Sequence, residues 1–133
     1  MIANGLPPEQ TIFLADSDEK AEKIARSNSI MTAYRYLASA IKKGPGLEIM
    51  KDDLCIEDSE IDDDYFINNL IIAGSVETVL QRILGLIDDV GTFGTLINMS
   101  FDWINDSDRR SWMESMALFQ NELMPSLNKA VDN

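Results

Sequence analysis

Apolar residues along the chain fall into short blocks that are separated by longer stretches with helical spacing. The short blocks occupy residues 11–15, 70–73 and 95–99, and glycine or polar residues bound them. Blocks of this length, bounded in this way, are typical of buried strands. Apolar residues three or four positions apart follow each block. Strands that alternate with helices predict an α/β fold with parallel strands and right-handed crossovers.

The first helical stretch follows directly on the first block. Asp16 and Glu19 have the spacing of a capping box, so we expect a helix to start there. A polar triplet at residues 27–29 interrupts the apolar pattern, which then restarts in a new phase and ends at the glycine-proline-glycine of residues 44–46. The pattern is consistent with one kinked helix or with two helices.

The clearest amphipathic helix follows the second block, between Ser75 and Gly91. Ser75 can accept a hydrogen bond from the first turn, and Glu77 lies near the positive end of the helix dipole. We predict that the apolar stripe of this helix covers one face of the sheet. The stripe consists of Val76, Val79, Leu80, Ile83, Leu86, Ile87 and Val90.

The third block leads through a polar loop at residues 102–106 into a last helical stretch. Asp106 or Ser107 can cap this helix, and we expect Pro125 to close it. Its apolar residues are Trp112, Met116, Phe119 and Leu123. We interpret Met99, Met113, Met116 and Met124 as filling in the core.

Residues 47–64 are rich in acidic side chains, eight of which lie between Asp52 and Asp64. A calcium loop starting at Asp58 is the alternative to a solvated surface insertion. However, Asp63 stands where such a loop needs glycine, and Asn69 stands where it needs a bidentate glutamate. We therefore expect a surface insertion without a metal site, in which Asp62 caps a short helix.

Composition narrows the possible functions. The chain has 133 residues, enough for a single domain, and a formal net charge of −12, which disfavours nucleic acids and anionic membrane surfaces. It has one cysteine and no histidine, so an internal disulfide and histidine-based catalysis are both excluded within this sequence. The N-terminal residues lack the features of a signal peptide and no apolar run has the length of a membrane helix, so we expect a cytoplasmic protein.

Four segments resemble the bacterial-luciferase-like flavin-dependent monooxygenases, in the branch that contains alkanal and limonene monooxygenases. They are residues 13–19 (FLADSDE), 64–75, 93–103 and 115–125 (SMALFQNELMP), in the order of the family. Two positions depart from the family pattern. Val76 stands where the family usually has proline, and Phe101 stands where this branch often has histidine, which weakens any carried-over site role there.

The resemblance implies that residues 1–133 are a C-terminal fragment of a TIM barrel, comprising its last three β/α units and a helical insertion. A full-length relative would use reduced flavin mononucleotide (FMN), or a deazaflavin, and oxygen to oxidise an aldehyde, an alkane or a terpene-like substrate. The family's upstream flavin contacts are missing from this sequence, so we expect the chain alone to be inactive and free of flavin. A non-catalytic α/β association module is the alternative.

Barrel enzymes place their active sites at the carboxyl ends of the strands. By this resemblance, Asp102 and Trp103 are weak candidates for contacting the flavin or an apolar substrate. A turn residue and a loop-anchoring aromatic are the structural alternatives for them. Arg109 and Arg110 could pair with a flavin phosphate, but surface ion pairs are the more common role. No residue is predicted to be catalytic.

A barrel fragment would leave two sheet edges open. We therefore predict either a homodimer or association with an N-terminal barrel half. The helices of residues 27–43 could cover part of the second face of the sheet.

Overall fold

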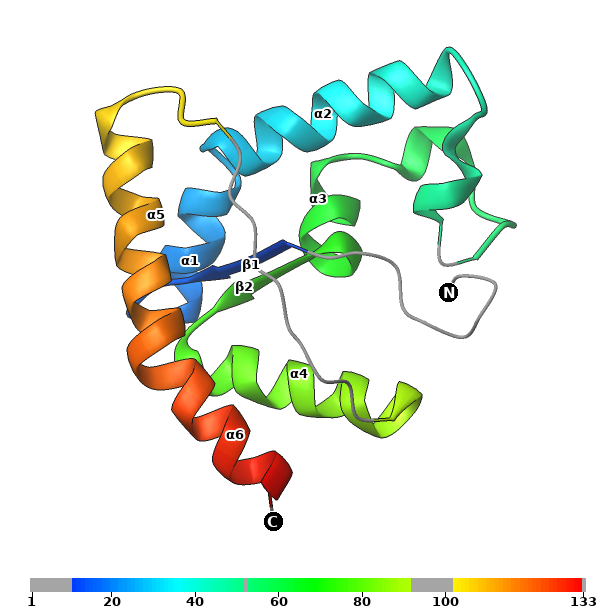
Figure 1. The fold of residues 1–133 in the computed structure, drawn as a ribbon. Coiled ribbons are helices and arrows are strands. Elements are labelled where there is room, and N and C mark those ends of the chain that lie inside the picture. Colours follow the sequence, from blue (N-terminus) through cyan, green and yellow to red (C-terminus); the bar gives the residue numbers. More distant parts are fainter. Residues whose placement is uncertain (1–10, 52, 92–101, 133) are drawn as a thin grey trace.

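The computed structural model describes residues 11–51, 53–91 and 102–132. At its centre lie two parallel strands, β1 (Thr11–Leu14) and β2 (Ile71–Gly74), which pair from Thr11 opposite Ile71 to Leu14 opposite Gly74 (Figure 1). Two of the predicted strands are therefore confirmed. The third predicted strand, at residues 95–99, lies outside the described residues.

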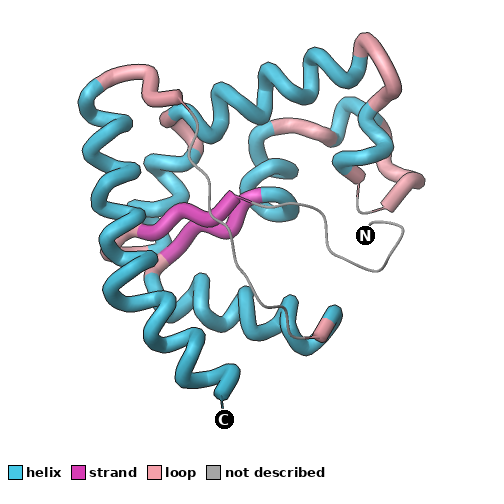
Figure 2. Tube along the Cα trace, in the orientation of Figure 1, coloured by secondary structure: helices cyan, strands magenta, loops and turns pink. Residues whose placement is uncertain are grey.

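Helices surround this pair of strands (Figures 1 and 2). The α-helices are α1 (Asp18–Ala25), α2 (Ser29–Lys42), α3 (Asp63–Tyr65), α4 (Val76–Val90), α5 (Asp106–Leu118) and α6 (Met124–Asp132). Short 3-10 turns lie at Leu47–Met50 and Asp58–Glu60, and π-helical turns lie at Phe66–Leu70 and Phe119–Leu123. The described part is thus mostly helical.

Both faces of the strands are covered, as expected for a buried parallel pair. Phe13 and Ile71 belong to a core with α1 and α2, whereas Ile12 and Ile72 belong to a second core with α4 and α6. Figure 1 shows α2 and α4 on opposite sides of the strands. The predictions that the α4 stripe covers one face and that residues 27–43 cover part of the other are both confirmed.

The polar triplet separates two helices and does not kink one. Asn28 caps α2 by accepting a hydrogen bond from the Ile30 N–H at 2.9 Å. The predicted start of α1 was wrong by one residue. Ser17, whose backbone is extended, is the N-cap and accepts from the Lys20 N–H at 3.2 Å, while Asp16 pairs with the Lys20 ammonium.

Helix α4 has the predicted ends. The Ser75 hydroxyl accepts from the Thr78 N–H at 3.3 Å, and Gly91 follows the last turn with a φ of 87°, which glycine adopts without strain. Val79 and Ile83 are essentially fully buried in the second core. The predicted amphipathic helix is therefore confirmed in position and orientation.

The last helical region differs from the prediction at both ends. Asn105 caps α5 by accepting from the Asp108 N–H at 2.8 Å, so neither Asp106 nor Ser107 is the cap. Pro125 does not close the region, because the chain continues helically to Asp132. A π-helical turn immediately before Pro125, in which the Met124 N–H donates to the Phe119 carbonyl, accommodates the missing proline donor.

Candidate functional site

The carboxyl ends of β1 and β2 are joined by a single carboxylate. Asp18, in the first turn of α1, accepts a hydrogen bond from the Ser75 backbone N–H at 2.8 Å and another from the Thr78 hydroxyl at 2.9 Å. Ser75 and Thr78 belong to the loop and first turn that follow β2. Asp18 thus links the two strand-to-helix junctions at the carboxyl ends of the strands, where parallel α/β folds place their sites.

The surroundings of Asp18 favour its charged form. The Ser75 N–H, and then the Thr78 hydroxyl, hold the pKa of the Asp18 carboxyl below its ordinary value. Gly74 leaves room beside it, because a side-chain carbon at this position would lie 2.8 Å from an Asp18 oxygen and would displace that carboxylate. The end of α4, where an external anion could bind in principle, is therefore occupied by an anion of the chain itself.

This arrangement does not fit a flavin phosphate at the start of α4. The Ser75 N–H is already donated to Asp18, and the Thr78 N–H is donated to the Ser75 hydroxyl. A phosphate would also meet the negative charge of Asp18. The described residues thus offer no complete flavin site at this position, and we assign them no step of flavin chemistry.

The outer edge of β1 is contacted by a helix. The Ala15 N–H points to β2 and donates to the Gly74 carbonyl at 3.2 Å, so the neighbouring Leu14 N–H points away from β2. It donates to the Ser115 hydroxyl of α5 at 2.8 Å, with both residues buried. The prediction of an open edge on this side was therefore wrong, because α5 lies along it.

The outer edge of β2 is contacted by an arginine. The Arg82 guanidinium of α4 donates to the Ile71 carbonyl at 3.4 Å, and burial lowers the pKa of this arginine. An open hollow of about 400 Å³ adjoins it, lined by Ile72, Arg82, Gly85, Leu86, Asp88 and Asp89. Its two aspartates oppose the binding of an anion there.

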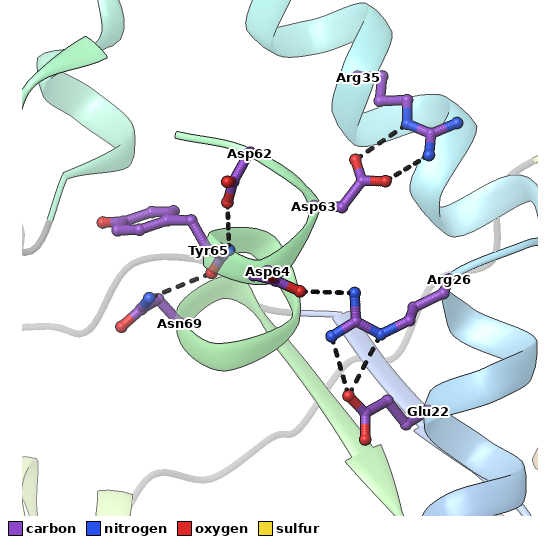
Figure 3. Close-up of polar contacts among 8 residues, drawn as sticks. All are labelled: Glu22, Arg26, Arg35, Asp62, Asp63, Asp64, Tyr65 and Asn69. Atoms are coloured by element: carbon purple, nitrogen blue, oxygen red, sulfur yellow. Dashed lines mark hydrogen bonds and ion pairs between the residues drawn. The ribbon is translucent and has the colours of Figure 1, made fainter. Parts of the chain in front are cut away.

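The acidic insertion is held to α1 and α2 by arginines (Figure 3). Arg35 of α2 forms a bidentate pair with Asp63, in which the Arg35 Nε lies 2.9 Å from the Asp63 Oδ1. Arg26, after α1, contacts Asp64 at 2.8 Å and Glu22 at 3.0 Å. These contacts fix α3 beside the first core.

The same close-up shows how α3 is capped. Asp62 accepts from the Tyr65 N–H at 3.0 Å, which confirms the predicted cap, and the Asn69 amide donates to the Tyr65 carbonyl at 3.1 Å. The Arg35 guanidinium lowers the pKa of Asp63 through its hydrogen bonds. Exposed ion pairs of this kind contribute about 0–1 kcal/mol each. The network therefore positions the insertion and carries no catalytic arrangement.

Asp102 and Trp103 lie in the segment that precedes α5. Both side chains are exposed, and 46% of the Trp103 surface is accessible to solvent. Neither side chain forms a hydrogen bond to another described residue. Arg109 and Arg110 are exposed on α5. In the described part of the chain, none of these four residues forms a hydrogen bond or an ion pair with Asp18 or Ser75. Their roles in binding remain predictions.

The methionine interpretation is only partly right. Met116 and Met124 pack against the two cores, as predicted, whereas Met113 is 52% exposed and is not a core residue. Met99 lies outside the described residues. A methionine adjacent to the buried Trp112 on a helix necessarily points to a different side, which explains the error.

Within the described ranges, no group of three or more cysteine, aspartate or glutamate side chains could hold a metal ion. None of the described helices is long and apolar enough to cross a membrane. Three acidic residues of the insertion pair with basic side chains: Asp58 with Lys51 at 2.7 Å, Asp63 with Arg35 and Asp64 with Arg26. Asp53, Glu60 and Asp62 instead accept from backbone N–H groups.

The sequence analysis did not identify Asp18, which lies at the carboxyl ends of the two strands, or Ser115, which lies at the outer edge of β1. Asp18 lies inside the FLADSDE segment, and Ser115 begins the SMALFQNELMP segment, so both fall in the segments on which the family resemblance rests. Those segments were the available indication. Their partners, Ser75 and Leu14, are 57 and 101 positions away and cannot be identified from local pattern.

No family model matches the chain. Among characterised proteins, it is similar to three diketocamphane monooxygenases of Pseudomonas putida. It is 26% identical to 3,6-diketocamphane 1,6-monooxygenase over 118 residues, covering 88% of the chain and 31% of that enzyme. It is 32% identical to 2,5-diketocamphane 1,2-monooxygenase 2 over 120 residues, covering 87% of the chain and 32% of that enzyme.

A solved structure of the same kind of enzyme also matches the chain. It is a type II Baeyer–Villiger monooxygenase, the oxygenating constituent of 3,6-diketocamphane monooxygenase from the CAM plasmid of Pseudomonas putida, in complex with FMN. The match has a TM-score of 0.75 and 26% sequence identity, and it covers 88% of this chain and 32% of that structure.

The fold and these matches define an α/β chain whose homologues are luciferase-like flavin-dependent monooxygenases, which confirms the sequence resemblance. Within that class, the relatives are named as diketocamphane monooxygenases, and the one of known structure is a type II Baeyer–Villiger monooxygenase. The chain spans about one third of the length of the relatives it matches, consistent with a C-terminal part of such an enzyme.

Proposed function

We propose that this chain forms the C-terminal part of a flavin-dependent monooxygenase, in which it completes a (β/α) barrel and the remaining polypeptide supplies most of the flavin site. The observation that carries this proposal is the coverage. Nearly the whole chain aligns with the oxygenating constituent of 3,6-diketocamphane monooxygenase, but with only 32% of that structure. The related structure contains FMN, so FMN is the proposed cofactor of the complete enzyme.

The proposed substrate class is a cyclic ketone of terpene origin. The relatives are named for diketocamphanes, and the sequence resemblance already included terpene-like substrates. A Baeyer–Villiger reaction inserts one oxygen atom of O2 beside a carbonyl group; a bound reduced flavin would activate the oxygen, while the protein would orient the reactants. No described residue of this chain is assigned a chemical step.

The contribution of this chain is a supporting one. Asp18 fixes the carboxyl ends of β1 and β2 relative to one another through the Ser75 N–H and the Thr78 hydroxyl. Strand ends held in this way can position loops at the mouth of a barrel. The loop that contains Asp102 and Trp103 is the proposed contact with the flavin or the substrate, as the resemblance implies.

A domain-replacement chimera tests this function. The matched third of Pseudomonas putida 3,6-diketocamphane 1,6-monooxygenase is exchanged for this chain, and FMN binding is measured by fluorescence quenching. We expect stoichiometric binding by the chimera. The control is the same enzyme with its matched third deleted, which should not bind. A folded chimera that binds no better than this control would overturn the proposal.

The assembly of the isolated chain also stays a proposal. We propose association with the remaining barrel polypeptide, with a homodimer as the alternative that light scattering after gel filtration at micromolar concentration would detect. A cytoplasmic location is proposed from the sequence, since its single cysteine fits a reducing compartment.

A further inference from the structure

The first turn of helix α5 holds a buried carboxylate. Asp108 is 4% exposed, and within the described ranges it is the one charged residue among the buried side chains. Its Oδ2 accepts the Ile104 backbone N–H at 3.1 Å, and its own backbone N–H donates to the Asn105 side chain at 2.8 Å. These two contacts, one in each direction, close residues 104–108 into a single turn.

The contact between Asp108 and Ile104 is not a helix cap. Asn105 is the N-cap of α5, so the Ile104 N–H precedes the helix and is not one of the first-turn donors that a cap satisfies. The other oxygen of Asp108 is buried without a partner among the described residues, which costs stability. The Asp108 carboxylate therefore fixes the segment before the helix, whereas Asn105 caps the helix itself.

That segment carries Trp103. The Ile104 N–H belongs to the planar peptide unit that joins Trp103 to Ile104, so a hydrogen bond to it restrains this plane and the ψ angle of Trp103. Trp103 is 46% exposed and belongs to neither core, so side-chain packing restrains its indole only in part. The direction of the indole therefore depends on the backbone that Asp108 holds.

Asp108 lies on the side of α5 that is docked against the rest of the fold. Trp112, one turn later on the same buried side, meets the Phe13 ring of β1 edge to face, with ring centroids 5.3 Å apart. Its indole N–H donates to the Ser29 hydroxyl of α2 at 3.0 Å. The position of Trp103 is thus tied, through Asp108 and α5, to the strands at the centre of the molecule.

We propose that Asp108 is a positioning residue of the monooxygenase, which presents the Trp103 indole to the ketone substrate. This inference rests on the proposed function, and it selects the ketone over the flavin as the group that Trp103 contacts. Trp103 and Ile104 both expose apolar side chains, and a neutral cyclic ketone that packs on them removes this surface from water. A flavin phosphate would instead meet the exposed carboxylate of Asp102 beside them.

The positioning role is tested in this chain by hydrogen exchange. Asp108→Ala removes the acceptor of the Ile104 N–H and should increase its exchange by about tenfold. Asp108→Asn keeps a side-chain oxygen that can accept this donor, so it should retain most of the protection. Asp106→Ala is the matched control, because it removes an exposed carboxylate from the same turn.

Two results of this exchange experiment would overturn the positioning role. In the first, Asp108→Ala and Asp106→Ala change exchange at Ile104 equally, so that the buried carboxylate has no specific part in holding the segment. In the second, exchange at Ile83 in the core rises as much as exchange at Ile104, which would mean that the whole fold loosens.

The ketone role is tested in the chimera described above, with 3,6-diketocamphane as the probe. Calorimetric titration of the ketone into the FMN-loaded chimera measures its affinity, and fluorescence quenching measures that of FMN. We expect Asp108→Ala to weaken ketone binding by about tenfold while FMN binding stays at the parent value. Asp108→Asn and Asp106→Ala should bind both molecules as the parent chimera does.

A double variant shows whether Asp108 acts through Trp103. Trp103→Ala should weaken ketone binding, and the addition of Asp108→Ala should cause no further loss. Additive losses would overturn positioning through Trp103.

The remaining outcomes separate this inference from the proposed function. A parent chimera that binds FMN but not the ketone would overturn the ketone role and leave the proposed function standing. The same holds if Asp108→Ala weakens FMN and ketone binding equally. A parent chimera that folds without binding FMN would overturn the proposed function and with it the ketone role.

Discussion

The Asp18 carboxylate accepts the backbone N–H of Ser75 at 2.8 Å, across 57 positions of sequence. It connects the helix after β1 to the helix after β2, at the edge where the two strands end. The contact satisfies a donor in the first turn of α4 and places a negative charge at the positive end of its dipole. Asp18 therefore adds a side-chain link between two β/α units whose strands already pair through their backbones.

Asp18→Asn should destabilise the fold and change its pH dependence. Because the folded state lowers the pKa of Asp18, its carboxylate contributes stability above the ordinary value of 3.8, and this contribution is lost as the pH falls through the lowered value. The variant should therefore differ most from the parent at neutral pH and least near pH ~2. Urea denaturation across this range measures the difference.

Asp16→Asn is the control for this prediction, because it removes the same charge from an exposed residue whose partner is Lys20. It should have a smaller effect at neutral pH. A difference between Asp18→Asn and the parent that stays constant from pH ~2 to pH ~7 would contradict a charged role for Asp18.

Trp112→Phe should lower the free energy of unfolding by about 1–3 kcal/mol, from lost packing against Phe13 and an unpaired Ser29 hydroxyl. Trp112 is fully buried, whereas Trp103 is 46% exposed, so Trp103→Phe provides the same substitution in an open environment. It should change stability by less than about 0.5 kcal/mol. Chemical denaturation followed by circular dichroism compares the two, and equal effects would show that α5 is not docked through Trp112.

Ile83→Asp should unfold the protein. Ile83 is 1% exposed and lies in the middle of the α4 stripe. An unpaired buried carboxylate costs several kcal/mol, against a total stability of ~5–15 kcal/mol for a typical domain. Gln81→Asp adds the same charge on the exposed side of the helix and should retain a cooperative thermal transition. Cooperative melting of Ile83→Asp near the parent temperature would show that the stripe is not buried.

The isolated chain should bind FMN negligibly. Two donors at the start of α4, the Ser75 and Thr78 N–H groups, are used by Asp18 and Ser75, the Asp18 charge repels a phosphate there, and the hollow beside Arg82 carries two aspartates. Titration of FMN with the chain, followed by flavin fluorescence, measures this directly. Stoichiometric quenching at micromolar concentrations would contradict the prediction and indicate a flavin site within this third of the enzyme.

Local sequence was sufficient for the elements whose ends and faces are set by neighbouring residues. The strand at Thr11–Leu14, the α4 stripe and the caps at Ser75 and Asp62 could all be predicted. Each depends on the period of apolar residues or on a side chain bonding three positions ahead. The family resemblance also came from sequence alone, since it rests on the order of short segments.

Cap positions at the starts of α1 and α5 could not be settled in the same way. Asp16, Ser17 and Asn105 to Ser107 are all residues that cap helices well, so several adjacent positions were compatible with the pattern. Ser17 and Asn105 are the N-caps because their backbones are extended where the chain enters each helix, and an extended residue there directs its side chain to the first turn. Pro125 was misleading because a π-helical turn lets the helix continue through it.

The sequence by itself predicted buried parallel strands, two of which the structure describes, alternating with amphipathic helices, and it indicated a resemblance to luciferase-like monooxygenases. Only the tertiary structure decided that α5 lies along β1, with Ser115 at the Leu14 N–H, and that Asp18 joins the two strand ends. Periodicity records which face of an element is buried, because that depends on residues a few positions apart. Which partner satisfies an outward N–H at a sheet edge depends on groups brought together from 101 positions away, and only the folded chain specifies them.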